Sequence, residues 1–192
     1  RPRSLWTKYS GNSENFASLK MKKKENKSTR PTIAFSSPVK ILVACAPYYR
    51  KIAKDLFSGA EKELEKANVS WDLVDVPGAL EIPTVIAMAD QLKKYDGYIA
   101  LGCVIRGETI HFETVSRESS NSLSLLGLRG LCIGNGILTV DNIKQAEVRA
   151  DPNMLNKGGE AAAAALTLIK LRQGWSKEPV SMGFNFTKTR KK

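Results

Sequence analysis

The sequence of 192 residues lacks any apolar run long enough to cross a membrane as a helix. Near its beginning it also lacks the apolar segment that a secretory signal peptide requires. Cysteine is scarce and odd in number: Cys45, Cys103 and Cys132 lie in separate apolar segments and form no C-x-x-C pair. These absences argue against a membrane protein, a disulfide framework and a metal site. We expect a reduced, cytoplasmic protein whose cysteines are small core residues.

A basic surface is missing from the body of the chain, although the net charge is +11. Residues 1–38 contain nine Lys or Arg and two Glu, and residues 174–192 contain five and one. Residues 39–173 therefore contain sixteen charges of each sign, and they are long enough to form one domain. A neutral body with basic tails argues against nucleic-acid binding, except through the tails themselves.

The two ends also differ from the body in composition. Residues 1–38 are polar, rich in Lys and Ser and without an apolar period, and residues 174–192 are similar, so we interpret both as disordered basic tails. Two interpretations of the first tail stay open. Translation begins at Met21, or the segment is an organellar transit peptide. The acidic residues Glu14 and Glu25 favour the first interpretation.

Within the body, apolar segments with strand character alternate with segments of helical period. The expected strands cover residues 39–46, 69–76, 98–105 and 131–140. A Gly-Asn-Gly sequence at 134–136 is expected to interrupt the last strand. Helices are expected between the strands, and two more follow: one capped by Asp141 and ending at Ala150, and one over Lys157–Arg172. This order predicts a flavodoxin-like α/β fold, a three-layer αβα sandwich with a four-stranded parallel sheet in the order 2-1-3-4.

In such a sheet the connections change direction between the first and third strands, and ligands bind there, beyond the carboxyl ends. Tyr48 follows the first strand. The stretch Tyr98–Val115 contains the third strand, a tight turn and the start of a helix with Thr109 as its N-cap. Free N–H groups and the positive end of the helix dipole predict an anion site at this turn. Gly107 would let the anion approach the backbone closely.

The only histidine of the chain, His111, falls in the first turn of that helix. The helix dipole disfavours an imidazolium there, so the neutral ring can accept a proton. An anion site beside a neutral base suits chemistry on a phosphorylated small molecule. The residues leave an equal alternative, namely a capping threonine followed by an ordinary surface histidine.

Three motifs carry a resemblance to a known family. The first is Gly-Cys-Val-Ile-Arg-Gly-Glu-Thr-Ile-His-Phe-Glu at 102–113, and the second is Val-Pro-Gly-Ala-Leu-Glu-Ile-Pro at 76–83. The third runs from Gly136 through Arg149 to Gly158 and matches in spacing. Together they resemble the 6,7-dimethyl-8-ribityllumazine synthase family over residues 39–175, and three long motifs in the right order are far more specific than one short pattern.

The resemblance implies a transferase of riboflavin biosynthesis that uses no metal and no organic cofactor. It would condense 5-amino-6-(D-ribitylamino)uracil with 3,4-dihydroxy-2-butanone 4-phosphate, giving 6,7-dimethyl-8-ribityllumazine, phosphate and water in the penultimate step of the pathway. The alternative from another class is a non-catalytic flavin- or lumazine-binding protein on the same scaffold. The resemblance also implies a homopentamer with active sites between subunits, which some members build into decamers or icosahedral shells. The turn at 151–154 favours a free pentamer.

The resemblance assigns roles to residues of this chain. His111 would transfer protons, Glu108 and Thr109 would bind phosphate through backbone amides, and Arg149 would bind phosphate through its planar fork. Lys157 and Glu160 would be supporting residues. The residues implied to bind the pyrimidine and its ribityl chain are Tyr48, Ala79, Leu80, Glu81, Cys103, Val104, Ile105 and Asn135.

Several of these residues have an ordinary structural alternative. Tyr48, where the family usually has Phe, either stacks on the pyrimidine or packs on the following helix. Glu81 would also be favoured simply as an acid at a helix N-terminus. Asn135 stands where many members have Phe, and it either hydrogen-bonds the uracil edge or is a turn residue between two glycines. Arg149 alone would be a solvated helix residue. The Glu108 carboxylate is expected to point away from phosphate, toward Arg106.

Overall fold

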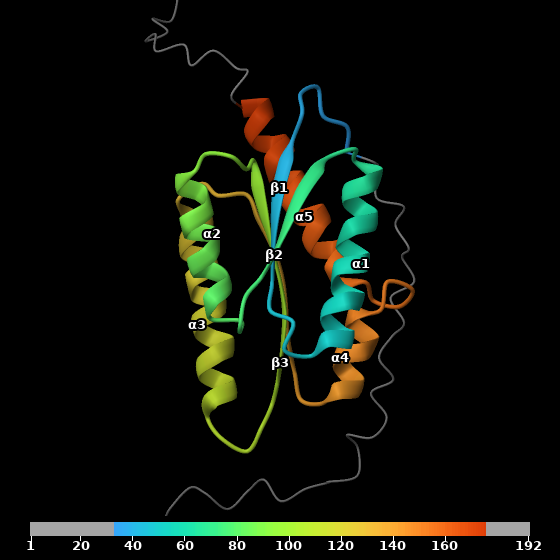
Figure 1. Cartoon of the computed structure of the whole chain (residues 1–192), viewed down its shortest axis with the longest axis vertical. Helices are drawn as coiled ribbons and strands as arrows, with labels where there is room; N and C mark the ends of the chain where they lie inside the picture. Colours follow the sequence, from blue (N-terminus) through green and yellow to red (C-terminus); the bar gives the residue numbers. More distant parts are fainter. Residues whose placement is uncertain (1–32, 176–192) are drawn as a thin grey trace, which may run out of the picture. The chain divides into compact units, whose positions relative to one another are not determined.

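A computed structural model describes residues 33–175, and the parts of the expected tails at 1–32 and 176–192 lie outside the described residues. The described part contains a four-stranded parallel sheet in the order β2-β1-β3-β4 (Figure 1). The predicted α/β fold and strand order are therefore confirmed. The strands are β1 (Lys40–Cys45), β2 (Ser70–Asp75), β3 (Gly97–Ile105) and β4 (Ile133–Val140).

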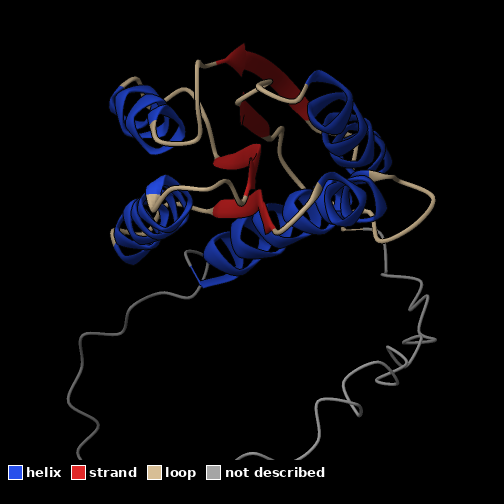
Figure 2. Ribbon diagram, turned by 90° about the horizontal axis from the view of Figure 1, so that it is seen from below, coloured by secondary structure: helices blue, strands red, loops and turns tan. Residues whose placement is uncertain are grey.

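Helices cover both faces of this sheet, as the end-on view shows (Figure 2). They are α1 (Arg50–Lys66), α2 (Glu81–Gln91), α3 (His111–Leu128), α4 (Ile143–Ala150) and α5 (Lys157–Trp175). Because side chains alternate along a strand, β1 feeds two cores. Leu42 and Ala44 pack in the core under α2 and α3, whereas Ile41 and Val43 pack in the core under α1, α4 and α5. None of the described helices is both long and apolar enough to span a bilayer.

The expected interruption of the fourth strand at 134–136 is wrong, because β4 runs without a break through it. The glycines serve helix packing instead of a turn. A Cβ on Gly134 would lie 1.9 Å from the backbone oxygen of Ala161 in α5. A Cβ on Gly136 would lie 3.1 Å from the Ala161 Cβ, and 2.8 Å from the Leu101 side chain in β3. The two glycines therefore let α5 lie directly on β4, and Ala161 is buried as its alanine-rich run predicted.

Two expected helix caps are one residue away from the observed ones. The cap of α4 is Asn142, whose Oδ1 accepts a hydrogen bond from the Gln145 N–H at 3.0 Å, and not Asp141. The cap position of α3 is Ile110, which gives no side-chain hydrogen bond, and not Thr109. At α4 the local sequence allowed either Asp141 or Asn142, and Asp141 is engaged by the tertiary contact described below. At α3 the Thr109 side chain instead accepts a bond from the His111 N–H, so it does not cap the helix from the N-cap position.

The folded body begins before the expected boundary at residue 39. Ile33 and Phe35 are partly buried against the core beneath α1 and α5. The Lys170 ammonium donates a hydrogen bond to the Ala34 carbonyl oxygen at 2.6 Å and lies 5.7 Å from the centre of the Phe35 ring. The interpretation of residues 1–38 as a disordered tail therefore does not extend to residues 33–38.

Candidate active site

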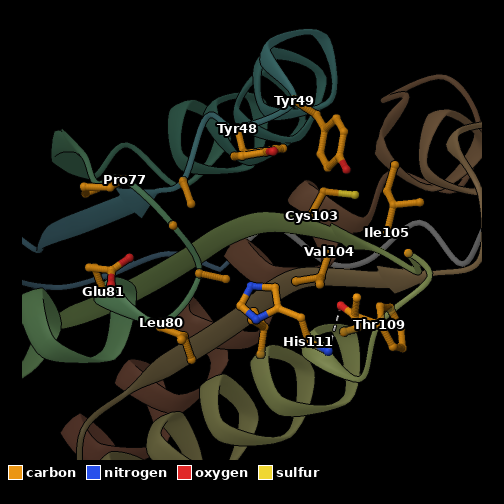
Figure 3. Close-up of a pocket in the computed structure, with 16 residues that line it drawn as sticks. Tyr48, Tyr49, Pro77, Leu80, Glu81, Cys103, Val104, Ile105, Thr109 and His111 are labelled. Atoms are coloured by element: carbon orange, nitrogen blue, oxygen red, sulfur yellow. Dashed lines mark hydrogen bonds between the residues drawn. The ribbon is translucent and has the colours of Figure 1, made fainter.

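A pocket of about 500 Å³ opens where β1 and β3 end side by side. This is the point where the chain connections leave the sheet in opposite directions, as predicted from the strand order. Its lining comes from the ends of β1 and β3, the segment before α2, and the turn into α3 (Figure 3). The lining residues are Ala46, Tyr48, Tyr49, Pro77, Gly78, Ala79, Leu80, Glu81, Cys103, Val104, Ile105, Gly107, Thr109, His111, Phe112 and Val115.

The turn between β3 and α3 presents unpaired backbone amides beside the pocket. Within the described residues, the N–H groups of Gly107, Glu108, Thr109 and Ile110 donate no hydrogen bond. Thr109 Oγ1 instead accepts a long bond of 3.4 Å from the His111 N–H. A Cβ at Gly107 would meet nothing within 4 Å, so the turn is open to a ligand. Free amides at the N-terminus of an 18-residue helix are suited to hold a phosphate.

His111 begins α3, and its exposed side chain enters the pocket. In the close-up the imidazole projects from the helix start toward the side where Leu80 and Glu81 lie (Figure 3). Within residues 33–175 the ring has no hydrogen-bond partner. Its nitrogen atoms are therefore free to exchange a proton with a bound molecule.

The wall opposite α3 is the segment from Pro77 to Glu81. Pro77 and Gly78 end the second strand segment, and α2 starts at Glu81. The Glu81 carboxylate folds over Gly78, where a Cβ would lie 3.0 Å from Oε2. Ala79 is buried and Leu80 is exposed. This wall gives the pocket one carboxylate acceptor in an otherwise uncharged surface.

A further wall of the pocket consists of two tyrosines and the end of β3 (Figure 3). Tyr48 is 75% exposed, and its ring meets that of Tyr49 edge-on with centroids 5.0 Å apart. Tyr49 packs against the core with Cys103, so of the two rings Tyr48 is the one left free to cover a ligand. Burial raises the pKa of the Cys103 thiol to about 11. The thiol is therefore protonated at neutral pH, which fits a wall residue and not a nucleophile.

The pocket brings together most of the expected site residues, but five lie outside its lining. Glu108 is exposed on the turn. Asn135 lies on β4, where its Oδ1 accepts a hydrogen bond from the Ile137 N–H at 3.0 Å. Arg149 lies in the last turn of α4 and donates to the Gln145 carbonyl oxygen at 3.1 Å. The other two, Lys157 and Glu160, form an ion pair on the first turn of α5.

The expected approach of Glu108 to Arg106 is wrong. The Arg106 guanidinium pairs with Glu113 in α3, and its Nε lies 3.1 Å from Asp141 Oδ1 after β4. Its centre also lies 4.2 Å from the centre of the Phe112 ring. Both carboxylates are further from Arg106 in sequence than Glu108 is, yet they pair with the guanidinium because the fold places both next to it.

The resemblance did not assign a role to several lining residues, namely Ala46, Tyr49, Pro77, Gly78, Gly107, Phe112 and Val115. Pro77, Gly78, Gly107 and Phe112 are within the quoted motifs, so the motifs themselves carried the signal. Ala46 and Val115 have only apolar character, which does not distinguish a pocket floor from a core. In the described part of the chain, no group of three or more His, Cys, Asp or Glu is placed to hold a metal ion.

Comparison with known proteins identifies this arrangement. The family model described as 6,7-dimethyl-8-ribityllumazine synthase matches residues 38–173. Proteins of that name from Jannaschia sp. and Novosphingobium aromaticivorans are 46% and 53% identical over 151 and 137 residues, covering 79% and 71% of this chain and 85% and 99% of the relatives. A third, from Zymomonas mobilis, is 50% identical over 134 residues, which are 70% of this chain and 96% of the relative. The chain belongs to the 6,7-dimethyl-8-ribityllumazine synthase family.

Proposed function

We propose that this chain condenses 5-amino-6-(D-ribitylamino)uracil with 3,4-dihydroxy-2-butanone 4-phosphate to form 6,7-dimethyl-8-ribityllumazine in riboflavin biosynthesis. An amine of the uracil attacks the ketone, and water leaves to form an imine. Phosphate is then eliminated to leave an enol that becomes a second carbonyl group, and the second amine attacks this carbonyl and closes the ring with loss of a second water. Each step moves protons at nitrogen or carbon, and one step releases an anion.

A single observation carries this proposal: an unpaired imidazole and a carboxylate line one pocket, and free amides for an anion lie beside it. The amides of Glu108 and Thr109 would hold the phosphate of the ketone while it is the leaving group. His111, two residues further along, would remove and return protons near that phosphate. Both roles use groups that have no other partner within the described residues.

The opposite side of the pocket suits the uracil and its ribityl chain. Tyr48 would stack on the pyrimidine, and backbone groups of Cys103, Val104 and Ile105 would bind its edge. Glu81 would accept hydrogen bonds from ribityl hydroxyls, since an ionised carboxylate offers several acceptor sites. Ala79 and Leu80 would shape the same wall.

We further propose that the active site is completed by a neighbouring subunit of a homopentamer. Asn135 and Arg149 lie outside the lining of the pocket of their own chain, and Arg149 lies on the last turn of α4. In an adjacent subunit these residues would face the uracil and the phosphate, with Lys157 and Glu160 supporting them. Particle size measured by light scattering tests the assembly, and a shell-sized particle would contradict the free pentamer.

The activity is tested by mixing the two substrates with the protein and following lumazine absorbance against the uncatalysed background. We expect formation well above that background, and its loss in a Tyr48→Ala, His111→Ala double variant. Tight binding of a lumazine or flavin without turnover would contradict the proposal and identify a binding protein instead. Isothermal titration with the product measures that binding separately.

A further inference from the structure

Arg106 occupies a junction of three elements without lining the pocket itself. Its backbone N–H donates to the Val140 carbonyl oxygen at 2.9 Å, which joins the end of β3 to the end of β4. Its side chain pairs with Glu113 in the first turn of α3 and with Asp141 at the approach to α4. Its guanidinium also stacks on Phe112, which lines the pocket.

The turn that follows Arg106 has few internal contacts of its own. Its amides from Gly107 to Ile110 are unpaired within the described residues, and Ile110 provides no side-chain cap for α3. A turn of this kind would sample several conformations unless its two ends were held. Arg106 restrains both ends of the turn. Its backbone directly follows β3 and bonds to β4, and its side chain contacts Glu113 and Phe112 in the first turn of α3.

The charges at this junction argue against Arg106 as a direct phosphate ligand. One guanidinium faces two carboxylates, so the group has a net negative charge before any ligand arrives. The guanidinium lowers the pKa of Glu113, which keeps that carboxylate ionised. The planar fork of Arg106 is thus already engaged on two sides, and the phosphate contacts are left to the backbone amides.

We infer that Arg106 is a positioning residue, whose clamp on Glu113, Asp141 and Phe112 holds the phosphate turn and His111 in their working geometry. This inference rests on the proposed function, because it assigns the turn to the phosphate of the ketone substrate. Arg106 would raise affinity for that substrate without touching it. Small displacements of positioned groups have large effects on rate, on the order of a hundredfold for about 1 Å.

The test compares Arg106→Met, which keeps length and loses charge, with Arg106→Lys, which keeps charge and loses the fork. We expect Arg106→Met to raise the KM for the ketone phosphate roughly tenfold or more and to lower kcat, with the KM for the uracil unchanged. Arg106→Lys should recover only part of the loss. Arg117→Met is the matched control, because Arg117 lies in α3, the helix that Arg106 contacts, and pairs with its neighbour Glu118 outside the pocket.

Two further measurements separate positioning from other roles. Asp141→Asn and Glu113→Gln should raise the KM for the ketone phosphate in the same way. Combining either substitution with Arg106→Met should raise this KM little further. If Arg106→Met raises the KM for the ketone phosphate and neither carboxylate variant does, Arg106 binds phosphate directly and the inference is wrong. Equal changes in both KM values with a large fall in melting temperature would indicate a structural role and also overturn it.

Inorganic phosphate provides a readout that does not depend on turnover. In the wild type, titration with phosphate should shift the backbone amide resonances of Thr109 and His111, and in Arg106→Met these shifts should need at least tenfold more phosphate. If the wild type shows the shifts but forms no lumazine, the proposed function fails and the positioning inference for an anion site survives. If Arg106→Met binds phosphate as the wild type does, the inference fails.

Discussion

A Cβ on Gly158 would lie 1.8 Å from the backbone carbonyl oxygen of Leu56, so α5 touches α1 main chain to main chain. No side-chain movement can relieve such a clash. We expect Gly158→Ala to lower the free energy of unfolding by at least the ~1–3 kcal/mol typical of overpacking. The control is Gly127→Ala in α3, where nothing lies within 4 Å. The free energy of unfolding of that variant should rise by about 0.4–1 kcal/mol. Urea unfolding measures both, and an unchanged Gly158→Ala midpoint would contradict the contact.

Replacing His111 by Ala should lower turnover and leave the fold intact, because the ring is exposed and has no partner in the described residues. Loss of a general acid–base group costs roughly 10²–10⁴-fold, and we expect the low end because solvent also exchanges protons during ring closure. Steady-state kinetics from about pH 6 to pH 8 provide the measurement. If turnover equals that of the wild type throughout, His111 has no part in the mechanism.

Removing the Arg149 guanidinium should weaken binding of the phosphate substrate in the transition state. Loss of a charged hydrogen-bond partner costs on the order of 1.5–3 kcal/mol, which is roughly ten- to a hundredfold in kcat/KM. Lys144→Ala removes the same charge from an exposed position of the same helix and should have little effect.

Mixing Arg149→Ala with Tyr48→Ala then tests where Arg149 acts. If the two residues serve different sides of a shared site, mixed assemblies contain some sites with both wild-type residues, and activity should partly return. Chains that carry both substitutions, mixed with wild type at the same ratio, control for dilution. Complete subunit exchange without recovery would show that both residues act in one chain's pocket.

The thiol of Cys103 should react slowly at neutral pH, although it lines the pocket. Burial raises its pKa to about 11, so the reactive thiolate is a minor species until the pH approaches that value. Alkylation by iodoacetamide, located by mass spectrometry, should accelerate roughly tenfold per pH unit from about pH 7 to pH 10. Cys103→Ser should keep most of the turnover. Fast alkylation at pH 7 would contradict a protonated thiol.

Shortening the chain should have different effects on the two sides of residue 33. Removal of residues 1–37 eliminates the packing of Ile33 and Phe35 and the Lys170 contact with Ala34. We therefore expect a lower melting temperature for that deletion than for removal of residues 1–32. Phe35→Ala in the full chain should reproduce part of the difference. Equal melting temperatures for the two deletions would show that residues 33–37 contribute nothing to stability.

The sheet order and the position of the pocket could be predicted because they depend on local signals. Apolar strands such as Gly97–Ile105 separated by helical segments leave few possible topologies, and the parallel order places Tyr48 and Arg106 at the same edge. Caps were harder, because Asp141 and Asn142 are equally suitable in sequence. Only the tertiary pairing of Asp141 with Arg106 leaves Asn142 as the cap.

The predicted interruption of the fourth strand at 134–136 was wrong because glycine occurs in turns and also in tightly packed strands. The Gly-Asn-Gly sequence at 134–136 has the composition of a turn, and no local pattern distinguishes a turn from a strand lying under a helix. The difference depends on Ala161, which is 27 positions away from Gly134. Similarly, the partners of Arg106 depend on where α3 begins and β4 ends in space, which the sequence around Arg106 does not determine.

The separation of Arg149 from the pocket of its own chain has a thermodynamic consequence if a second copy supplies it. A substrate that contacts two chains binds the assembled form better than the separate chains, so substrate binding and association are linked by mass action. Each would strengthen the other by the same factor. Dilution would then lower the activity per chain before any chain unfolds, and saturating phosphate substrate would shift that loss to lower protein concentrations. Below the concentration at which the chains assemble, doubling the protein concentration would therefore more than double the total activity.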